Sequence, residues 1–208
     1  SDFNPPNGAT CGRVRADKFD VKLVDENDEE VPTGSVGELV VRPKIPWIVM
    51  AGYWGRPAET LAVWRNLWLH SGDLLRKDEQ GYYYFVDRLT DSIRRRGENI
   101  SSVEVENAIN AIPEVLETAV LPVVSDLTEQ EVLACVVFRP GADLDLGELH
   151  SRIARTLPKF MVPRYLKRIE SVPKTPTGKP QKFKLRDDVS VPDLWDAQKQ
   201  KAGAQLRP

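Results

Sequence analysis

Residues 82–112 read YYYFVDRLTDSIRRRGENISSVEVENAINAI, and two different spacings of apolar residues meet inside this stretch. The aromatic run Tyr82 to Val86 is typical of a β-strand. Further on, Ser101-Ser102-Val103-Glu104 forms a capping-box pattern, and apolar residues then recur at helical spacing until Pro113 ends the run. The pattern therefore predicts β structure before residues 87–91 and an amphipathic helix after them.

The residues upstream of this stretch predict further strands. Short β-type runs lie at 21–24 and 38–42, and a third spans Trp64 to His70, followed by a polar turn at 77–81. Most of the five tryptophans fall in β-like or turn segments, where burial is the usual role of an indole. We therefore expect a β-rich first part with tryptophan in its core.

Downstream, helical and strand patterns alternate, which predicts a fold of the α+β class. Helices are expected over 102–112 and 146–157, and strands over 118–124, 132–138 and 165–169. We place a domain boundary near Asp87 to Asp91. The expected parts are a β-rich piece over 1–87, an α+β domain over 88–188 and a loosely held polar tail over 189–208.

The bulk composition excludes several classes of protein. Lys and Arg total 29 against 31 Asp and Glu, a net charge of -2, so the basic surplus of a nucleic-acid or anionic-membrane binder is missing. No apolar run is long enough for a membrane span. Cys11 and Cys135 lack the companions that a metal site or a disulfide framework needs. We expect a cytoplasmic protein without metal ligands. Because the chain begins at Ser1 rather than Met, we also expect the protein to extend further towards the N-terminus.

Residues 173–179, PKTPTGK, present a lysine on a loop with restricted backbone. The prolines fix their own φ, and Gly178 can adopt positive φ beside Lys179, so the cation is held where it can meet a phosphate. The stretch is not a P-loop, because Pro173 and Pro180 stand where that motif needs Gly and Ser or Thr. Taken alone, a Thr-Gly-Lys turn is more often a solvated loop than a functional one.

Three further groups of residues precede this loop in a fixed order. They are Gly52-Tyr53-Trp54 with Thr60, then His70-Ser71-Gly72-Asp73, and then Asp87-Arg88 followed by Arg94-Arg95-Arg96-Gly97-Glu98-Asn99. Together with PKTPTGK, their order and spacing resemble the adenylate-forming (AMP-binding) superfamily of acyl-CoA synthetases, luciferases and peptide-synthetase adenylation domains. The nearest resemblance is to acyl-CoA ligases of the carnitine- or crotonobetaine-CoA ligase type.

The resemblance implies the C-terminal part of an ATP-dependent acyl-CoA ligase. Such enzymes join a carboxylic acid to ATP, giving acyl-AMP and pyrophosphate, and CoA then displaces AMP. Residues 1–87 would be the last β-rich subdomain of the large N-terminal AMP-binding domain, and residues 88–188 the small C-terminal lid domain. The implied substrates and cofactors are a small carboxylic acid, ATP, Mg2+ and CoA. The implied partner is the missing remainder of the N-terminal domain.

The resemblance also assigns residues to the first half-reaction. Lys179 matches the lysine that stabilises charge while the adenylate forms, a task for a cation aimed at a transferring phosphoryl group. Asp73 matches the aspartate that binds the ribose hydroxyls, and Arg88 matches an arginine near the same ribose. Without the resemblance, a turn cap at Asp73 and a surface ion pair at Arg88 are the commoner roles.

Family enzymes rotate the C-terminal domain before the second half-reaction. Gly97, with Glu98 beside it, is assigned to CoA binding, because it matches a glycine that lines the pantetheine path. Arg94 falls where some relatives carry a lysine that meets the adenylate. Thr90 takes the hinge position, where relatives usually have Asp or Lys, so the hinge departs from the family pattern. A plain hairpin turn and a solvated basic strand edge are the alternatives for this segment.

Two other interpretations stay open. The chain could be a non-catalytic module that keeps a nucleotide- or CoA-shaped surface or docks a protein. It could also come from a peptide-synthetase adenylation domain, although no carrier-like Gly-x-Asp-Ser segment follows residue 186. The family's triphosphate loop and acid pocket are absent from the sequence. We therefore expect the isolated chain to be inactive and to hold none of the cofactors.

Overall fold

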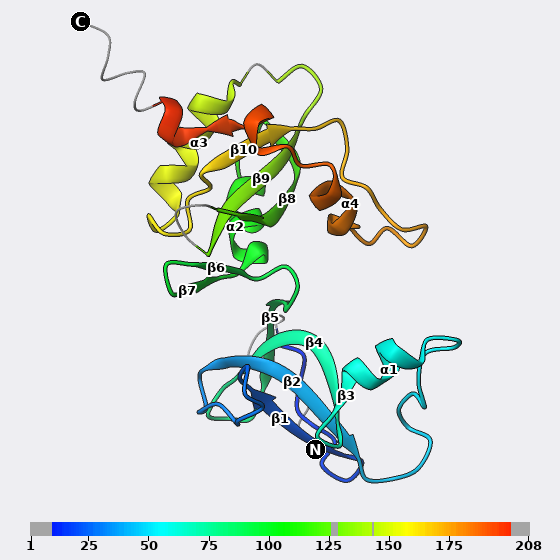
Figure 1. Cartoon of the computed structure of the whole chain (residues 1–208). Coiled ribbons are helices and arrows are strands. Elements are labelled where there is room, and N and C mark those ends of the chain that lie inside the picture. Colours follow the sequence, from blue (N-terminus) through cyan, green and yellow to red (C-terminus); the bar gives the residue numbers. More distant parts are fainter. Residues whose placement is uncertain (1–9, 126–128, 143, 201–208) are drawn as a thin grey trace, which may run out of the picture. The chain divides into compact units, whose positions relative to one another are not determined.

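The computed structural model describes residues 10–125, 129–142 and 144–200, and it divides the chain into two compact units, Ser1–Thr90 and Asp91–Pro208 (Figure 1). The predicted α+β class is confirmed, because the first unit is built mainly of strands and the second combines helices with a sheet. The division falls within the segment 87–91. A boundary between 87 and 88 would cut a strand of the first unit, since Arg88 still pairs with a neighbouring strand.

The first unit is built on a five-stranded antiparallel sheet. Its strands are β1 (Phe19–Val24), β2 (Val36–Pro43), β3 (Trp64–Arg65), β4 (Trp68–Lys77) and β5 (Tyr83–Arg88). β4 is central, because β2 pairs along one of its edges while β3 and β5 pair with its two ends. Leu23, Leu75 and Tyr83 form the small buried core on this sheet.

Two local features of the first unit differ from expectation. The run from Trp64 to His70 is not one strand, because Asn66 and Leu67 both have positive φ (50° and 66°), as the two-residue hairpin turn between β3 and β4 requires. A short helix, α1 (Pro57–Val63), was not predicted. It begins with proline, whose missing N–H costs nothing in the first turn, and none of its residues is buried.

The expectation that tryptophan fills the core of the first unit is wrong. Trp47 and Trp54 are 95% and 100% exposed, because both lie in the loop between β2 and α1 and not on a face of the sheet. Trp68 is on β4 but is only partly buried. The cationic groups of Lys22 and Arg42 lie 5.4 and 4.6 Å from the centroid of its ring. Its indole thus packs against cations at the surface.

The second unit contains a four-stranded sheet in the order β11-β10-β9-β8 and a separate two-stranded hairpin, β6-β7. β9 runs parallel to β10 and antiparallel to β8. The elements are β6 (Ile93–Arg95), β7 (Glu98–Ile100), α2 (Ser102–Asn110), β8 (Val115–Val124), β9 (Gln130–Phe138), α3 (Leu146–Thr156), β10 (Tyr165–Arg168), α4 (Lys182–Asp187), the 3-10 helix η1 (Val191–Asp193) and β11 (Trp195–Asp196). Both predicted long helices and all three predicted strands are present.

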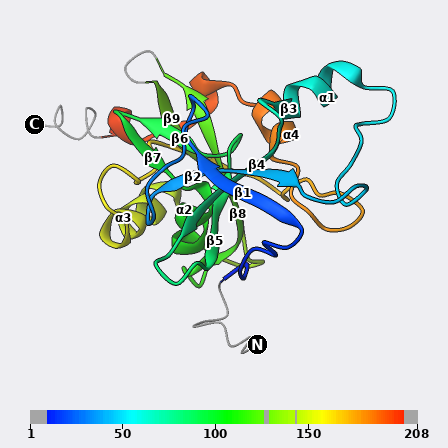
Figure 2. The same cartoon turned by 90° about the horizontal axis from the view of Figure 1, so that it is seen from below.

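β9 is buried on both faces, and its side chains alternate between two cores. Val132, Ala134 and Val136 pack with α2 and α3, which lie beside each other in Figures 1 and 2, whereas Leu133 and Cys135 pack with residues of α4 and the C-terminal segment. Such double burial explains why β9 reads as a continuous apolar run. The sheet is therefore the middle layer of the second unit.

Local capping explains where the helices begin. The Oγ of Ser101 accepts the N–H of Glu104 at 3.2 Å, which confirms the predicted capping-box start of α2. Asp145 caps α3 in the same way, since its Oδ1 accepts the N–H groups of Gly147 and Glu148. α2 ends at Asn110, slightly before the expected end.

Residues 189–200 are not the loosely held tail that the polar composition predicted. Leu194 and Asp196 are 6% and 4% exposed, and β11 adds a strand to the edge of the sheet beside β10. The guanidinium of Arg164 lies 3.1 and 3.3 Å from the two carboxylate oxygens of Asp196. A few apolar residues are enough to hold this segment, so its polar composition did not indicate that it packs against the sheet. Residues 201–208, the rest of the expected tail, lie outside the described residues.

Asp196→Asn should lower the stability of the second unit by about 1–3 kcal/mol at pH 7, because Arg164 would lose a charged hydrogen-bond partner. Burial raises the pKa of Asp196, but the hydrogen bonds and charge of Arg164, together with backbone N–H donors such as that of Gln198, outweigh burial and hold that pKa below its usual value. The stabilisation that comes from a lowered carboxyl pKa is fully present above the pKa that the group has in the unfolded chain, about 4. It is lost as the pH falls through the lower pKa that the group has in the folded protein. The difference in stability between Asp196→Asn and the wild-type chain should therefore shrink as the pH falls below about 4.

Hydrogen exchange of the β9 amides under increasing urea measures this effect, because β9 reports on the second unit alone. Asp193→Asn is the matched control, since Asp193 is an exposed aspartate of the same segment. An equal loss of stability in both variants would show that the Arg164–Asp196 pair does not hold the C-terminal segment.

Candidate functional site

The loop that carries Lys179 is a closed hairpin. The N–H of Thr175 donates to the carbonyl of Lys179 at 2.8 Å, and the N–H of Gln181 donates to the carbonyl of Pro173 at 2.8 Å. The Oγ1 of Thr175 also accepts the N–H of Lys179 at 3.0 Å. Gly178 has a φ of +82°, which an L side chain rarely adopts. The backbone around Lys179 is thus fixed by local hydrogen bonds, as the sequence predicted.

The side chain of Lys179 is exposed and, among the described residues, forms no ion pair or side-chain hydrogen bond. The other lysine of the hairpin, Lys174, pairs instead with Glu117 of β8 at 2.7 Å. Of the two lysines, Lys179 is therefore the cation available to an anionic ligand.

Asp73 and Arg88 are brought together in the first unit. They face each other across β4 and β5, with Nη1 of Arg88 2.8 Å from Oδ1 of Asp73. The contact is ionic, because that Oδ1 accepts no well-aligned hydrogen bond from the described residues. Gly72 precedes the aspartate with a φ of +72°, and the N–H of Asp73 donates to Oγ of Ser71 at 3.1 Å. The pair is thus set on a turn-like irregularity of β4.

A buried carboxylate holds this irregularity in place. Glu38 of β2 is 6% exposed, and its Oε1 accepts the N–H of Gly72 at 3.0 Å. Its other oxygen lies 2.9 Å from Nδ1 of the buried His70. Sequence reasoning missed Glu38, because a glutamate in a strand looks like an ordinary solvent-facing residue until its partner strand is known.

Arg94, Gly97 and Glu98 lie on one hairpin, formed by β6 and β7. Arg96 and Gly97 occupy the two-residue turn with φ values of 55° and 79°. Nothing lies within 4 Å of the position that a Cβ on Gly97 would take, so its tip is bare on the side where a side chain would project. The segment thus forms the hairpin turn that was the alternative interpretation of its sequence. A role of Gly97 in CoA binding would be additional to this structural role.

A buried ion pair attaches this hairpin to the sheet. Nε of Arg95 lies 2.8 Å from Oε2 of Glu131, which is fully buried on β9. The same guanidinium donates to the carbonyls of Phe160 and Val162 at 2.9 and 3.0 Å. Burial holds the pKa of Arg95 below its usual value, although the charge of Glu131 works in the opposite direction. Removing one partner of such a pair leaves an uncompensated buried charge, so the hairpin is firmly anchored.

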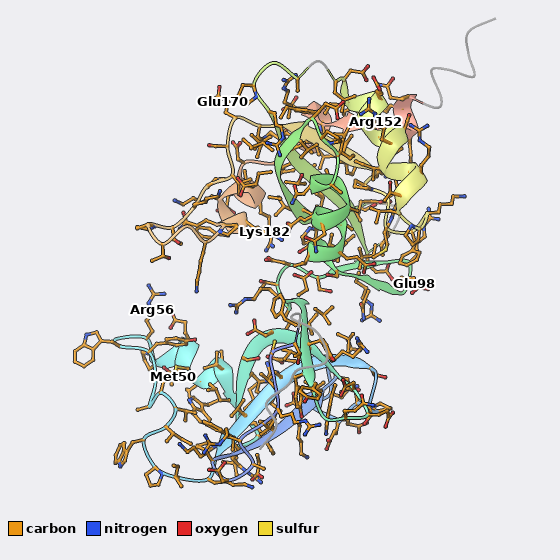
Figure 3. All side chains as sticks on the ribbon, turned by 180° about the vertical axis from the view of Figure 1, so that it is seen from behind. Met50, Arg56, Glu98, Arg152, Glu170 and Lys182 are labelled. Carbon is orange, nitrogen blue, oxygen red and sulfur yellow. The ribbon has the colours of Figure 1, made fainter. Side chains whose placement is uncertain are left out.

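The predicted hinge residue stands at the division between the units. Thr90 is the last residue of the first unit and is exposed. Within the second unit, Glu98 and Lys182, which adjoins the Lys179 hairpin, lie well apart (Figure 3). The two hairpins therefore present their residues from different parts of the same unit.

Other chemistry finds little support in the described ranges. Within them, no group of three or more His, Cys, Asp or Glu is placed to hold a metal ion, and no helix is long and apolar enough to cross a membrane. Burial raises the pKa of the Cys135 thiol to about 11, whereas Cys11 is exposed. Burial thus disfavours the thiolate form of Cys135, which a nucleophilic cysteine needs.

Comparison with known proteins agrees with these features. Residues 104–179 match the model of the AMP-binding enzyme C-terminal domain. The crotonobetaine/carnitine–CoA ligase of Citrobacter koseri is 32% identical over 169 residues, which are 81% of this chain and 33% of that protein. The feruloyl-CoA synthase of an Amycolatopsis species is 39% identical over 167 residues, 80% of this chain and 33% of that protein.

Solved structures agree as well. The amide bond synthetase McbA from Marinactinospora thermotolerans is 34% identical, with a TM-score of 0.72 over 88% of this chain and 37% of that one. ATP-bound MatB from Rhodopseudomonas palustris is 29% identical, with a TM-score of 0.76 over 89% of this chain and 37% of that one. The chain spans about a third of the length of the curated relatives that it matches. Residues 104–179 thus form an AMP-binding enzyme C-terminal domain, and the curated relatives over this C-terminal portion are acyl-CoA ligases.

Proposed function

We propose that the chain is the C-terminal part of an ATP-dependent acid–thiol ligase that makes an acyl-CoA through an acyl-adenylate. The observation that carries the proposal is the exposed Lys179, whose side chain pairs with none of the described residues, on a hydrogen-bonded hairpin at the end of the family match. The first unit, which ends at Thr90, then belongs to the last subdomain of the AMP-binding domain, and the second unit, which begins at Asp91, forms the lid. The activity is that of the full-length protein.

In the first half-reaction, Lys179 supplies positive charge. A carboxylate oxygen of the substrate attacks the α-phosphorus of ATP, and the bond to the pyrophosphate oxygen breaks. Negative charge grows on the oxygens that surround phosphorus, and a lysine placed beside them lowers the barrier without any proton transfer. Mg2+ would arrive with the ATP phosphates, which it binds more readily than a dedicated protein cage.

Asp73 and Arg88 would hold the nucleotide. A carboxylate has several acceptor sites and can bind two neighbouring ribose hydroxyls at once. The side chain of Asp73 is 28% exposed, so part of its carboxylate is open to a ligand. Arg88, at 2.8 Å, orients this carboxylate. Glu38 would support both by fixing the turn at Gly72.

In the second half-reaction the β6-β7 hairpin would take over. The thiol of CoA attacks the carbonyl carbon of the acyl-adenylate, and AMP leaves with the electrons of the broken C–O bond. The bare tip at Gly97, with Glu98 beside it, leaves room for an extended chain such as pantetheine, and Arg94 adds a positive charge for the adenylate. Thr90, at the end of the first unit, would be the pivot between the two arrangements.

One alternative concerns the group that accepts the acyl chain. The similarity to an amide bond synthetase favours an amine as a second candidate acceptor in place of the CoA thiol. Supplying acyl-AMP to the full-length protein with CoA or with an amine, and separating thioester from amide, distinguishes them. A non-catalytic module would form neither product.

Lys179→Ala in the full-length protein should slow adenylate formation by about a hundred- to a thousandfold, as expected when one transition-state donor is removed. Thioester formation from supplied acyl-AMP should be little changed, because Lys179 acts only on the first transition state. Exchange of labelled pyrophosphate into ATP measures the first step. Lys184→Ala removes an exposed lysine of α4 and serves as the control. Equal losses in both half-reactions would assign the hairpin a purely structural role.

The isolated 208-residue chain should form no acyl-CoA from a carboxylic acid, ATP and CoA. One lysine cannot replace the triphosphate loop and the acid pocket that relatives supply from their remaining length. Chromatographic detection of acyl-CoA is the measurement. Product made by the purified chain would contradict its role as one part of a larger enzyme.

Thr90→Pro in the full-length protein should suppress one half-reaction and spare the other, because proline fixes φ near −65° and so restricts the proposed pivot. Thr90→Ala removes the same side chain but leaves φ free, and it should support both steps. Both half-reactions are followed separately, by pyrophosphate exchange and by thioester formation from acyl-AMP. Unimpaired turnover of both in the proline variant would place the pivot elsewhere.

A further inference from the structure

Lys182 holds the base of the Lys179 hairpin, and it lies beyond the residues matched by the family model. Lys182 is the first residue of α4, directly after the bond that closes the hairpin between Gln181 and Pro173. Its side chain is only 11% exposed. Nζ lies 2.7 Å from Oε1 of Glu106 and 2.8 Å from Oγ of Ser102, both on α2.

The same cluster reaches the start of the second unit. Nζ of Lys182 lies 3.8 Å from Oδ2 of Asp91, and Nη2 of Arg186 lies 3.5 Å from Oδ1 of the same carboxylate. Asp91 is the residue that follows Thr90. Two cations of α4 therefore bind the residue next to the proposed pivot.

Two ion pairs fasten the hairpin, and the solvent exposure of their side chains indicates which of them holds it. The pair between Lys174 and Glu117, on the other leg, has side chains that are 43% and 31% exposed, so water screens it. Lys182 and Glu106 are 11% and 16% exposed, and Oε1 of Glu106 also accepts the N–H of Val120 at 2.8 Å. Removing Lys182 would leave that carboxylate without its cation in a largely dry site.

We infer that Lys182 is a positioning residue, which locks the base of the Lys179 hairpin to α2 and to Asp91. The hairpin and the residue after the pivot then move as one rigid body. An exposed lysine on a flexible stem needs a rigid base to meet the same point in every cycle, because small misplacements of a charged group are costly in catalysis. The inference rests on the proposed function of Lys179.

The first test needs only the 208-residue chain. Lys182→Met keeps the aliphatic stem and removes the charge. The hydrogen-bonded amides of Gly178, Lys179 and Gln181 should then exchange about tenfold faster, the usual weight of a hydrogen bond to a charged group. The β9 amides should be unaffected. Lys184→Met is the matched control on the same helix and should change neither set.

Unchanged exchange in the hairpin of Lys182→Met would overturn the inference. Should that variant fail to fold, Glu106→Gln gives the same test, because the amide keeps an acceptor for the N–H of Val120 but removes the charge that Lys182 binds. It should also speed exchange in the hairpin, and an unaltered hairpin would again overturn the inference.

The second test uses the full-length protein and separates positioning from folding. Lys182→Met should lower kcat of adenylate formation by about tenfold, in line with the loosened hairpin. The KM for ATP and thioester formation from acyl-AMP should stay unchanged, and Lys182→Arg should restore much of the rate. A looser hairpin with normal kcat would overturn the positioning role. Failure of the proposed function is distinguishable, because Lys179→Ala would then leave adenylate formation intact whatever the exchange data show.

Discussion

The double burial of β9 is the constraint on which the second unit depends. Its alternate side chains enter two cores, so helices must cover both faces of the sheet, and this requirement places α2 and α4 on opposite sides of one strand layer. The segments that carry functional residues are joined to the helices that cover this layer. The Lys179 hairpin leads into α4, and the β6-β7 hairpin leads into α2. A one-residue shift of β9 would exchange the two cores and displace both hairpins.

In each of the three candidate segments, a buried or half-buried carboxylate anchors the backbone that carries a candidate residue. Glu38 fixes the turn before Asp73, Glu131 binds Arg95 under the β6-β7 hairpin, and Glu106 binds Lys182 under the Lys179 hairpin. Each anchoring carboxylate lies on a strand or helix, and each segment that it anchors contains a glycine with positive φ, at Gly72, Gly97 or Gly178. Rigid elements thus supply precision, and the turns supply access to a ligand.

The sequence predicted what is local and missed what depends on distant partners. The helix at Ser102 and the strand β9 followed from capping and periodicity, because those patterns report burial within one element. The anchors were not predictable in this way, since Gly72 and Glu38 are 34 residues apart and Lys182 and Ser102 are 80 apart. The C-terminal segment was misjudged because a few buried side chains suffice to hold it. Trp47 and Trp54 were misjudged because a large apolar residue need not lie on a sheet face.

The two free thiols differ so strongly in setting that the chain has a built-in attachment point. Cys135 is a buried residue of β9 with a pKa of about 11, while Cys11 is open to solvent on the first unit. A maleimide dye added to the folded native sequence would couple at Cys11 alone, because only an accessible thiolate reacts. The indole of Trp195, the sole tryptophan of the second unit, offers a spectroscopic partner there. Once the four tryptophans of the first unit are replaced, energy transfer between the two would report on the proposed pivot at Thr90.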